Sequence, residues 1–201
     1  MEMKNFQSLL FAFLFLSIAS CNSISRESPE KRYYWIEISE KSLAEIQSSS
    51  KRPNIRLKRL TISPRYENKE FTYRRSDVLF ETDFYNLFFL TPANNLREEV
   101  TKALVRSGFL PLEDYVGQRN EENYSWEVNV SELYGDFRTG KGKAVIAWEW
   151  IVTREGGTLA RGMEKVEVPL TSSAPEALVE GWNQALWQIF RQTSQKWEGI
   201  R

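Results

Sequence analysis

The sequence contains no histidine and only one cysteine, Cys21. Without histidine there can be no Ser-His-Asp or Cys-His catalytic arrangement, no imidazole metal ligand and no imidazole proton shuttle near neutral pH. A single cysteine permits neither an intrachain disulfide nor a cysteine-rich zinc site. The sequence also lacks a GxxxxGK[ST] phosphate-binding loop and a Gly-x-Ser-x-Gly nucleophile elbow, so neither of these two catalytic motifs is available to the chain.

Charge is balanced, because Lys+Arg and Asp+Glu each number 27 in 201 residues. Proteins whose main role is to bind duplex nucleic acid are usually strongly basic, so nucleic acid is not the expected partner. A glycosidase needs two carboxylates, and Glu127, Glu149 and Glu164 are candidates. They fall on the polar faces of predicted strands, where exposed glutamates are ordinary. The sequence therefore predicts a protein that is not an enzyme and binds no metal or cofactor.

The first twenty residues have the three parts of a secretory signal peptide. Lys4 precedes an apolar run from Leu9 to Leu16, and small residues follow up to Cys21. A basic start, an apolar segment of about 7–15 residues and small residues before the cut are typical of such signals. The run is shorter than the roughly 20 apolar residues that span a bilayer. Residues 1–20 are therefore predicted to be removed on export.

The sequence Ile18-Ala19-Ser20-Cys21 resembles the bacterial lipobox, in which the cysteine is acylated. Cys21 then becomes the first residue of the mature chain and carries acyl groups such as palmitate. Several acyl chains anchor a protein stably, since each buried CH₂ contributes about 0.8 kcal/mol. Residues 21–31 are predicted to be a lipidated flexible tether, and residues 32–201 the folded domain. Asn22 is not the aspartate that signals inner-membrane retention, which favours the periplasmic face of the outer membrane.

Apolar periodicity in the first half of the domain predicts strands followed by a helix. Residues 34–38 alternate as a short first strand. A second strand, 55–62, changes phase at Lys58-Arg59, which indicates a bulge or a bend, and Pro64 closes the strand. A hairpin follows, with arms 71–74 and 78–85. A helix then begins at Thr91-Pro92, with Leu96, Val100, Ala103 and Leu104 on one face, and ends near Gly108.

The second half predicts a half-buried antiparallel meander over 124–169 and a C-terminal helix. Ser173 to Glu176 has the spacing of a capping box. Four tryptophans are in phase with predicted core faces: Trp126, Trp148, Trp150 and Trp182. Trp187 and Trp197 are less clearly placed and suit an interface if exposed. The fold class is α+β, with a mixed, mostly antiparallel sheet and two main helices packed on one face.

This order of segments resembles the ABC-type transport auxiliary lipoprotein family, whose members accompany MCE-type lipid transporters in Gram-negative bacteria. The similarity covers roughly Tyr33 to Trp197. It rests on a double-aromatic strand, a proline-closed strand, an aromatic hairpin leading into a helix, and a final strand pair and helix. The matching segments are Tyr33–Ile36, Ile55–Pro64, Phe71–Phe109 and Tyr124 to the C-terminal helix. Phe88 departs from the family, which commonly has tryptophan there, and the C-terminal helix is unusually rich in tryptophan.

The resemblance implies a non-catalytic accessory subunit of an intermembrane lipid transport system. Its implied partners are an MCE-domain protein and the ABC permease and ATPase of the same system, with the lipid membrane bound through acylated Cys21. Assembly into a homo-oligomer is left open. A second interpretation also stays open: a free-standing envelope lipoprotein that binds a ligand or assists outer-membrane assembly.

Charges are segregated along the chain in a way that suits docking. Residues 51–75 contain nine basic and two acidic side chains, whereas residues 113–132 contain six acidic and one basic. Such asymmetry favours head-to-tail assembly or contact with anionic headgroups or an acidic protein face. Arg56, Lys58 and Arg59 are the candidate contact residues. Solvated outer strand faces would explain the same charges, and a groove between the C-terminal helix and the sheet could instead hold an acyl chain.

Overall fold

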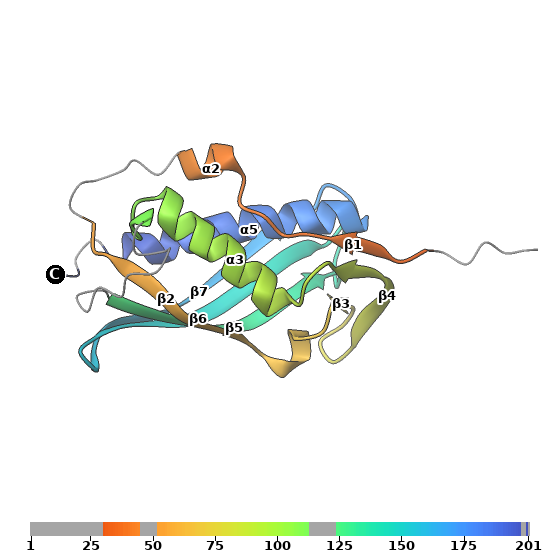
Figure 1. The fold of residues 1–201 in the computed structure, drawn as a ribbon. Helices are drawn as coiled ribbons and strands as arrows, with labels where there is room; N and C mark the ends of the chain where they lie inside the picture. Colours follow the sequence, from red (N-terminus) through yellow and green to blue (C-terminus); the bar gives the residue numbers. More distant parts are fainter. Residues whose placement is uncertain (1–29, 45–51, 113–123, 198–199, 201) are drawn as a thin grey trace, which may run out of the picture. The chain divides into compact units, whose positions relative to one another are not determined.

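The alternating segments form one mixed sheet of seven strands in a computed structural model that describes residues 30–44, 52–112, 124–197 and 200 (Figure 1). From Lys31 onward the chain belongs to one compact unit. Cys21, the predicted signal peptide and the tether up to residue 29 lie outside the described residues. The strands are β1 (Arg32–Tyr34), β2 (Ile55–Ile62), β3 (Glu70–Arg74), β4 (Phe80–Phe88), β5 (Tyr124–Asp136), β6 (Lys143–Arg154) and β7 (Gly157–Pro169).

The long strand β5 is the centre of this sheet. One of its edges pairs antiparallel with β6, which pairs antiparallel with β7. Its other edge is shared, because β2 pairs with residues 124–130 and β3 with residues 135–136, both in parallel. Beyond β3 come β4, antiparallel, and β1, parallel to β4. The predicted meander and hairpin are confirmed, and so is a mixed, mostly antiparallel sheet.

Two long helices, α3 (Pro92–Arg106) and α5 (Pro175–Gln195), pack against one face of the sheet. α3 lies over β2 and α5 lies over β6 and β7. The short elements α2 (Glu40–Ala44) and η1 (Pro64–Tyr66) complete the described secondary structure. α3 starts after Thr91 and ends before Gly108, which has a φ of 75°, as the sequence predicts. The fold class is therefore as predicted.

Six of the tryptophans named above form the core between sheet and helices. Trp126, Trp148, Trp150 and Trp182 are buried, as predicted. Trp187 is also buried, and Trp197 is fully buried against Phe109 and Trp126, with ring centroids 5.2 and 4.7 Å apart. The idea that Trp187 and Trp197 form an exposed interface is therefore wrong. Helical periodicity could not place Trp197, because α5 ends at Gln195 and Trp197 enters the core from beyond the helix.

The prediction of a first strand over residues 34–38 is wrong for all but Tyr34, because β1 spans Arg32–Tyr34 and residues 35–38 form no strand. Ile36 and Ile38 are nevertheless buried. The Ile36 N–H donates to Asn95 Oδ1 at 2.9 Å and the Ile36 carbonyl accepts from Asn95 Nδ2 at 2.8 Å. The Ile38 N–H donates to Glu99 Oε2 at 2.9 Å. Side chains of α3 thus make the hydrogen bonds to backbone N–H and C=O groups that a neighbouring strand would otherwise make.

The capping box expected at Ser173 to Glu176 is not formed. The N-cap of α5 is Ala174, which makes no side-chain capping hydrogen bond. Glu176 instead accepts from the Tyr34 hydroxyl at 2.8 Å and from Arg32 at 3.1 Å, which ties α5 to β1.

The prediction of a half-buried meander holds for only part of it, because near Val145 and Tyr134 both faces of the sheet are covered. β6 buries Val145 and Ala147 as well as its helix-facing side chains. Val145 pairs with Tyr134 of β5, and Tyr66 and Phe80 pack on the Tyr134 ring. η1 and the β3–β4 hairpin therefore cover the second face of the sheet there.

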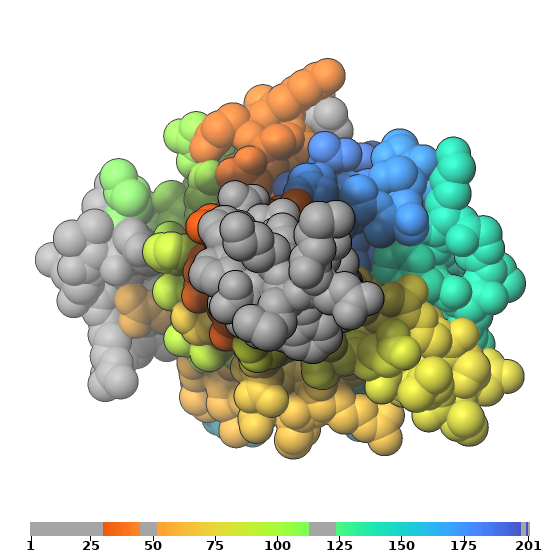
Figure 2. Space-filling model, turned by 90° about the vertical axis from the view of Figure 1, so that its right-hand side faces the viewer, coloured from red at the N-terminus to blue at the C-terminus, as the bar shows by residue number. Residues whose placement is uncertain are grey.

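Several connections meet at the end of the unit where β1 begins, which Figure 2 views head-on. Arg138, in the turn between β5 and β6, donates to Asp77 of the β3–β4 hairpin at 2.7 Å. The start of α5 lies at the same end through the contacts of Glu176 with β1. Among the described residues, no helix is both long and apolar enough to cross a bilayer.

Candidate partner-binding face of the sheet

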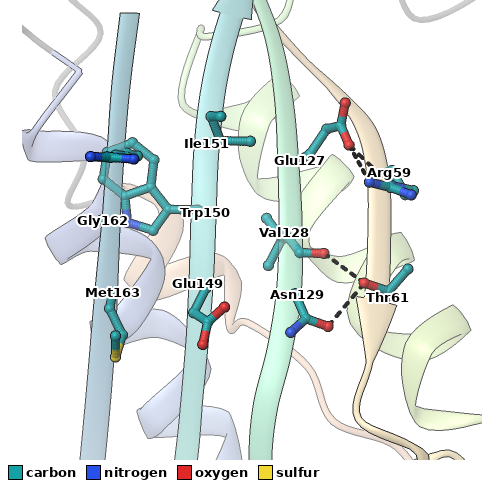
Figure 3. A pocket seen from close by; sticks show the side chains of 11 residues that line it. Arg59, Thr61, Glu127, Val128, Asn129, Glu149, Trp150, Ile151, Gly162 and Met163 are labelled. Carbon is teal, nitrogen blue, oxygen red and sulfur yellow. Dashed lines mark hydrogen bonds and ion pairs between the residues drawn. The ribbon is translucent and has the colours of Figure 1, made fainter. Parts of the chain in front are cut away.

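The face of the sheet that the helices leave uncovered carries a shallow cavity of about 600 Å³ across four strands. Figure 3 shows its outward side chains side by side on β2, β5, β6 and β7, with the helices behind the strands. They alternate with buried residues because successive side chains of a strand point to opposite faces. They are Arg59, Thr61, Glu127, Asn129, Glu149, Ile151, Arg161 and Met163.

A bulge in β2 brings two of the predicted contact residues to one carboxylate. The register between β2 and β5 shifts between Leu57 and Arg59. Neighbouring side chains of a regular strand point to opposite faces, but here Lys58 Nζ lies 3.0 Å from Glu127 Oε1 and the Arg59 guanidinium 2.7 Å from Glu127 Oε2. The phase change at Lys58-Arg59 correctly predicted this bulge.

Lys58, Arg59 and Glu127 form a cluster with a net charge of +1, which we call the clamp. Hydrogen bonds from Lys58 and then Arg59 hold the pKa of Glu127 below its ordinary value, so the carboxylate is ionised at neutral pH. Both cations remain largely exposed, whereas Glu127 is mostly covered by them. The Lys58 and Arg59 side chains therefore still present charge to solvent while their position is set by Glu127.

Arg56 occupies a different part of β2. It pairs in register with Ser125, is half-buried and makes interactions of its own within the structure. The structure thus brings Lys58 and Arg59 together through Glu127 and leaves Arg56 outside this clamp. A contact role for these three residues stays a prediction.

The cations of the basic segment, residues 51–75, do not form one continuous surface, because several of them pair with carboxylates in different parts of the fold. Arg75 pairs with Glu81 across the hairpin at 2.8 Å, and Arg74 lies 3.7 Å from Asp77. Glu127, which belongs to the acidic segment, is the partner of Lys58 and Arg59. Sequence reasoning placed Glu127 on the polar face of its strand but missed this role, because nothing in the sequence reports that β2 pairs with β5.

The rest of the face mixes apolar and charged side chains. Met163 is 69% exposed and lies opposite Glu149, whereas Ile151 is half-buried and lies opposite Arg161. Glu149 makes no hydrogen bond or ion pair with the residues that the structure describes. No group of three or more His, Cys, Asp or Glu side chains within those residues could hold a metal ion. The arrangement offers a broad surface with fixed charges and an apolar strip, which suits contact with another protein.

The space between the C-terminal helix and the sheet, which the sequence left open as a candidate acyl-chain groove, is filled in the described structure. Trp148 lies under α5, and its Nε1 donates to Thr193 Oγ1 at 2.9 Å. Phe71 and Phe88 pack on Trp182 at centroid distances of 5.0 and 5.3 Å. Aromatic side chains therefore occupy the space that an acyl chain would need.

Comparison with known proteins identifies the fold. The sequence matches no protein-family model and no curated protein. A crystal structure of an uncharacterised protein superimposes with a TM-score of 0.66 at 15% identity, over 83% of this chain and 98% of that chain. A protein from Xanthomonas campestris that carries the family designation DUF330 superimposes with a TM-score of 0.65 at 14% identity, over 81% and 92%. At such identities the likeness is one of fold, and the fold is similar to that of a DUF330 protein.

Proposed function

We propose that this chain is a non-catalytic accessory subunit of an ABC/MCE-type intermembrane lipid transport system, anchored to the cell envelope through acylated Cys21. The observation that carries the proposal is the order of family-like segments from Tyr33 to Trp197. These segments coincide with β1, β2, the β3–β4 hairpin with α3, and the β5–β6 pair with α5. The similarity in fold to a DUF330 protein is consistent with this assignment.

The use of the buried polar side chains supports a role without covalent chemistry. Asn95 and Glu99 are buried and spend their polar atoms on the backbone of Ile36 and Ile38. Thr193 accepts a hydrogen bond from Trp148. These three buried polar side chains are committed to holding the fold.

The anchor is tested at Cys21. We expect the mature N-terminus purified from envelopes to begin at Cys21 and to carry acyl groups, measured by mass spectrometry. A Cys21→Ser chain exported behind an ordinary cleavable signal peptide should move from the membrane fraction to the soluble periplasmic fraction, because several acyl chains are lost at once. An unmodified thiol at Cys21, or a wild-type chain that is already soluble, would contradict the anchor.

The partner is tested by purifying the acylated protein in mild detergent. Recovery of an MCE-domain protein with an ABC permease and ATPase is the expected result. If the acylated protein is recovered alone, the accessory-subunit role is wrong, and a free-standing envelope lipoprotein that binds a ligand or assists outer-membrane assembly replaces it. Sucrose-density separation of the envelope, on the same cells, reports whether the protein resides in the outer membrane as proposed.

The clamp of Lys58, Arg59 and Glu127, together with Arg56 on the same strand as the two cations, is the proposed contact for an acidic partner face. Changing Arg56, Lys58 and Arg59 to Glu should reduce co-purification of the transporter chains by about tenfold or more, since like charges facing each other at an interface cost several kcal/mol. That variant also places several carboxylates around Glu127, and their repulsion could itself disturb the fold. The sharper test therefore adds Glu127→Arg, which restores the ion pairs within the protein with the charges exchanged. Both variants should bind poorly while circular dichroism shows a native fold. Undiminished co-purification of the Glu127→Arg combination would remove the clamp from the interface.

A further inference from the structure

A carboxylate in β4 builds a bulge that projects two aromatic side chains outward. Glu70 of β3 pairs with Leu87, whereas Thr72 pairs with Thr82, so β4 contains extra residues between these positions. Asp83 closes the bulge: its Oδ1 accepts from the N–H groups of Tyr85 and Asn86 at 2.8 and 3.0 Å. Its Oδ2 accepts from the Tyr73 hydroxyl at 2.6 Å and from Asn86 Nδ2 at 2.7 Å. The bulge is therefore held in one shape by four hydrogen bonds.

The bulge exposes apolar surface. Phe84 is 65% exposed, Tyr85 is 38% exposed, and their rings pack edge to face at 5.2 Å. The turn of the same hairpin exposes Val78, Leu79 and Phe80, with Val78 at 92%. We call these five residues the tether-end surface. Exposed apolar side chains that are gathered on fixed backbone mark interaction sites more often than scattered ones do.

The charges around the hairpin turn are paired within the protein. Arg75 binds Glu81 at 2.8 Å, and Arg138 binds both Asp77 and Asp136 at 2.7 Å. The turn therefore presents apolar side chains with little net charge. This distinguishes it from the clamp on β2, where cations outnumber the carboxylate that holds them.

The folded unit begins beside this surface. β1 runs parallel to β4 with Arg32 opposite Asn86, so Lys31, the first residue of the unit, lies toward the bulge. Lys31 Nζ is 4.4 Å from the centroid of the Phe84 ring. The cysteine predicted to carry lipid lies ten residues before Lys31, a span of at most about 35 Å. A short tether holds the surface at an effective concentration in the millimolar range, so even weak affinity for the membrane suffices.

We infer that the tether-end surface docks onto the lipid bilayer in which Cys21 is anchored, with the aromatic bulge and the hairpin turn inserted at the level of the headgroups. The inference rests on the proposed lipid anchor and deepens it, because it orients the domain on the membrane. Aromatic rings prefer the interface between water and hydrocarbon, and a lysine beside them can keep its ammonium in the water. With the surrounding charges paired, apolar insertion drives the docking, and added salt changes it little.

The test measures the depth of single side chains on vesicles. Acylation blocks Cys21, the only cysteine, so a nitroxide label attaches to an introduced cysteine alone. Acylated Val78→Cys, Phe84→Cys and Met163→Cys proteins are placed in vesicles of phosphatidylethanolamine with phosphatidylglycerol. For each label we compare its accessibility to dissolved oxygen with its accessibility to a water-soluble nickel chelate. The ratio of the two should be severalfold higher at positions 78 and 84 than at position 163, which lies on the exposed face of β7.

A matched pair of variants isolates the aromatic bulge. Adding Phe84→Ser and Tyr85→Ser should return the label at position 78 to water, whereas adding Leu159→Ser and Met163→Ser, which alter exposed apolar side chains of β7, should leave it at depth. If the labels at 78 and 84 are as accessible to the nickel chelate as the label at 163, the surface does not meet lipid. That result overturns the inference and assigns the surface to a protein partner.

Failure of the anchor is visible separately. If mass spectrometry finds no acyl groups on Cys21, the proposed function fails, and the free Cys21 thiol of the mature chain can be coupled to a maleimide-bearing lipid. Hydrogen exchange of the amides from Ser76 to Asn86 should then slow at least about tenfold on vesicles if the surface docks. Unchanged exchange in this experiment would refute docking whatever the state of the natural anchor.

Discussion

Replacing Asn95 with Ala will lower the free energy of unfolding by about 2–4 kcal/mol. Asn95 is fully buried and makes two hydrogen bonds to the backbone of Ile36. Its loss leaves a buried N–H and a buried carbonyl without partners, and each such group costs about 1–3 kcal/mol. Urea denaturation followed by far-ultraviolet circular dichroism measures the change.

Asn94 provides the control, because it precedes Asn95 in α3 but is exposed, and its side chain makes no hydrogen bond to the described residues. Asn94→Ala should change stability by less than about 0.5 kcal/mol. Asn95→Asp is a second informative variant. It keeps an acceptor for the Ile36 N–H but places an oxygen against the Ile36 carbonyl, so it should also destabilise. Equal stability of the Asn94 and Asn95 alanine variants would show that the segment from Trp35 to Ser39 is not held by α3.

Trp197→Ala should cost about 3–5 kcal/mol, the range for removing a large aromatic side chain from a core. Trp197 is fully buried, with Phe109 and Trp126 at ring-centroid distances of 5.2 and 4.7 Å and Phe190 at 6.3 Å. Its removal leaves a cavity where α5, β5 and the end of α3 meet. The measurement is again denaturation by circular dichroism, since the substitution alters tryptophan fluorescence directly.

A milder substitution separates packing from polarity at the same position. Trp197 Nε1 is buried and has no hydrogen-bond partner among the described residues. Trp197→Phe therefore keeps part of the aromatic contact and removes an unpaired N–H, so it should cost less than half as much as Trp197→Ala. Phe89→Ala, at a ring that is 60% exposed, should leave stability nearly unchanged. A Trp197→Ala protein as stable as wild type would mean that the end of α5 does not complete the core.

Local patterns in the sequence predicted most individual elements. Alternation correctly identified β5, β6 and β7, and the phase change at Lys58-Arg59 correctly identified the bulge in β2. These features depend on a few neighbouring residues and on the two-residue period of a strand. The helix at 92–106 was equally well marked, because Pro92 and Gly108 have conformational preferences that fix its ends.

Pairing between distant segments could not be predicted. Alternation in residues 34–38 correctly predicted that Ile36 and Ile38 are buried, but only Tyr34 of this segment belongs to a strand, and the backbone of Ile36 and Ile38 binds side chains of α3. On β2 the sequence predicted three contact cations, Arg56, Lys58 and Arg59. The structure joins Lys58 and Arg59 to Glu127 and leaves Arg56 apart, and the sequence could not show this because Lys58 and Glu127 are 69 positions apart. The bulge at Asp83 was missed because its hydrogen bonds leave no periodic pattern.

The shared edge of β5 has a consequence for the order of folding. β2 can form its ladder only with residues 124–130, and β3 reaches β5 only at residues 135–136. Parallel pairing over such separations forms slowly, because the loop must close before any contact compensates for its entropy. If the chain is exported from its N-terminus, as the proposed anchor requires, β2 emerges long before its partner, and the backbone edge of β2 stays unpaired until β5 has emerged. Holding chaperones on the receiving side are expected to matter more for this protein than for one built from local hairpins.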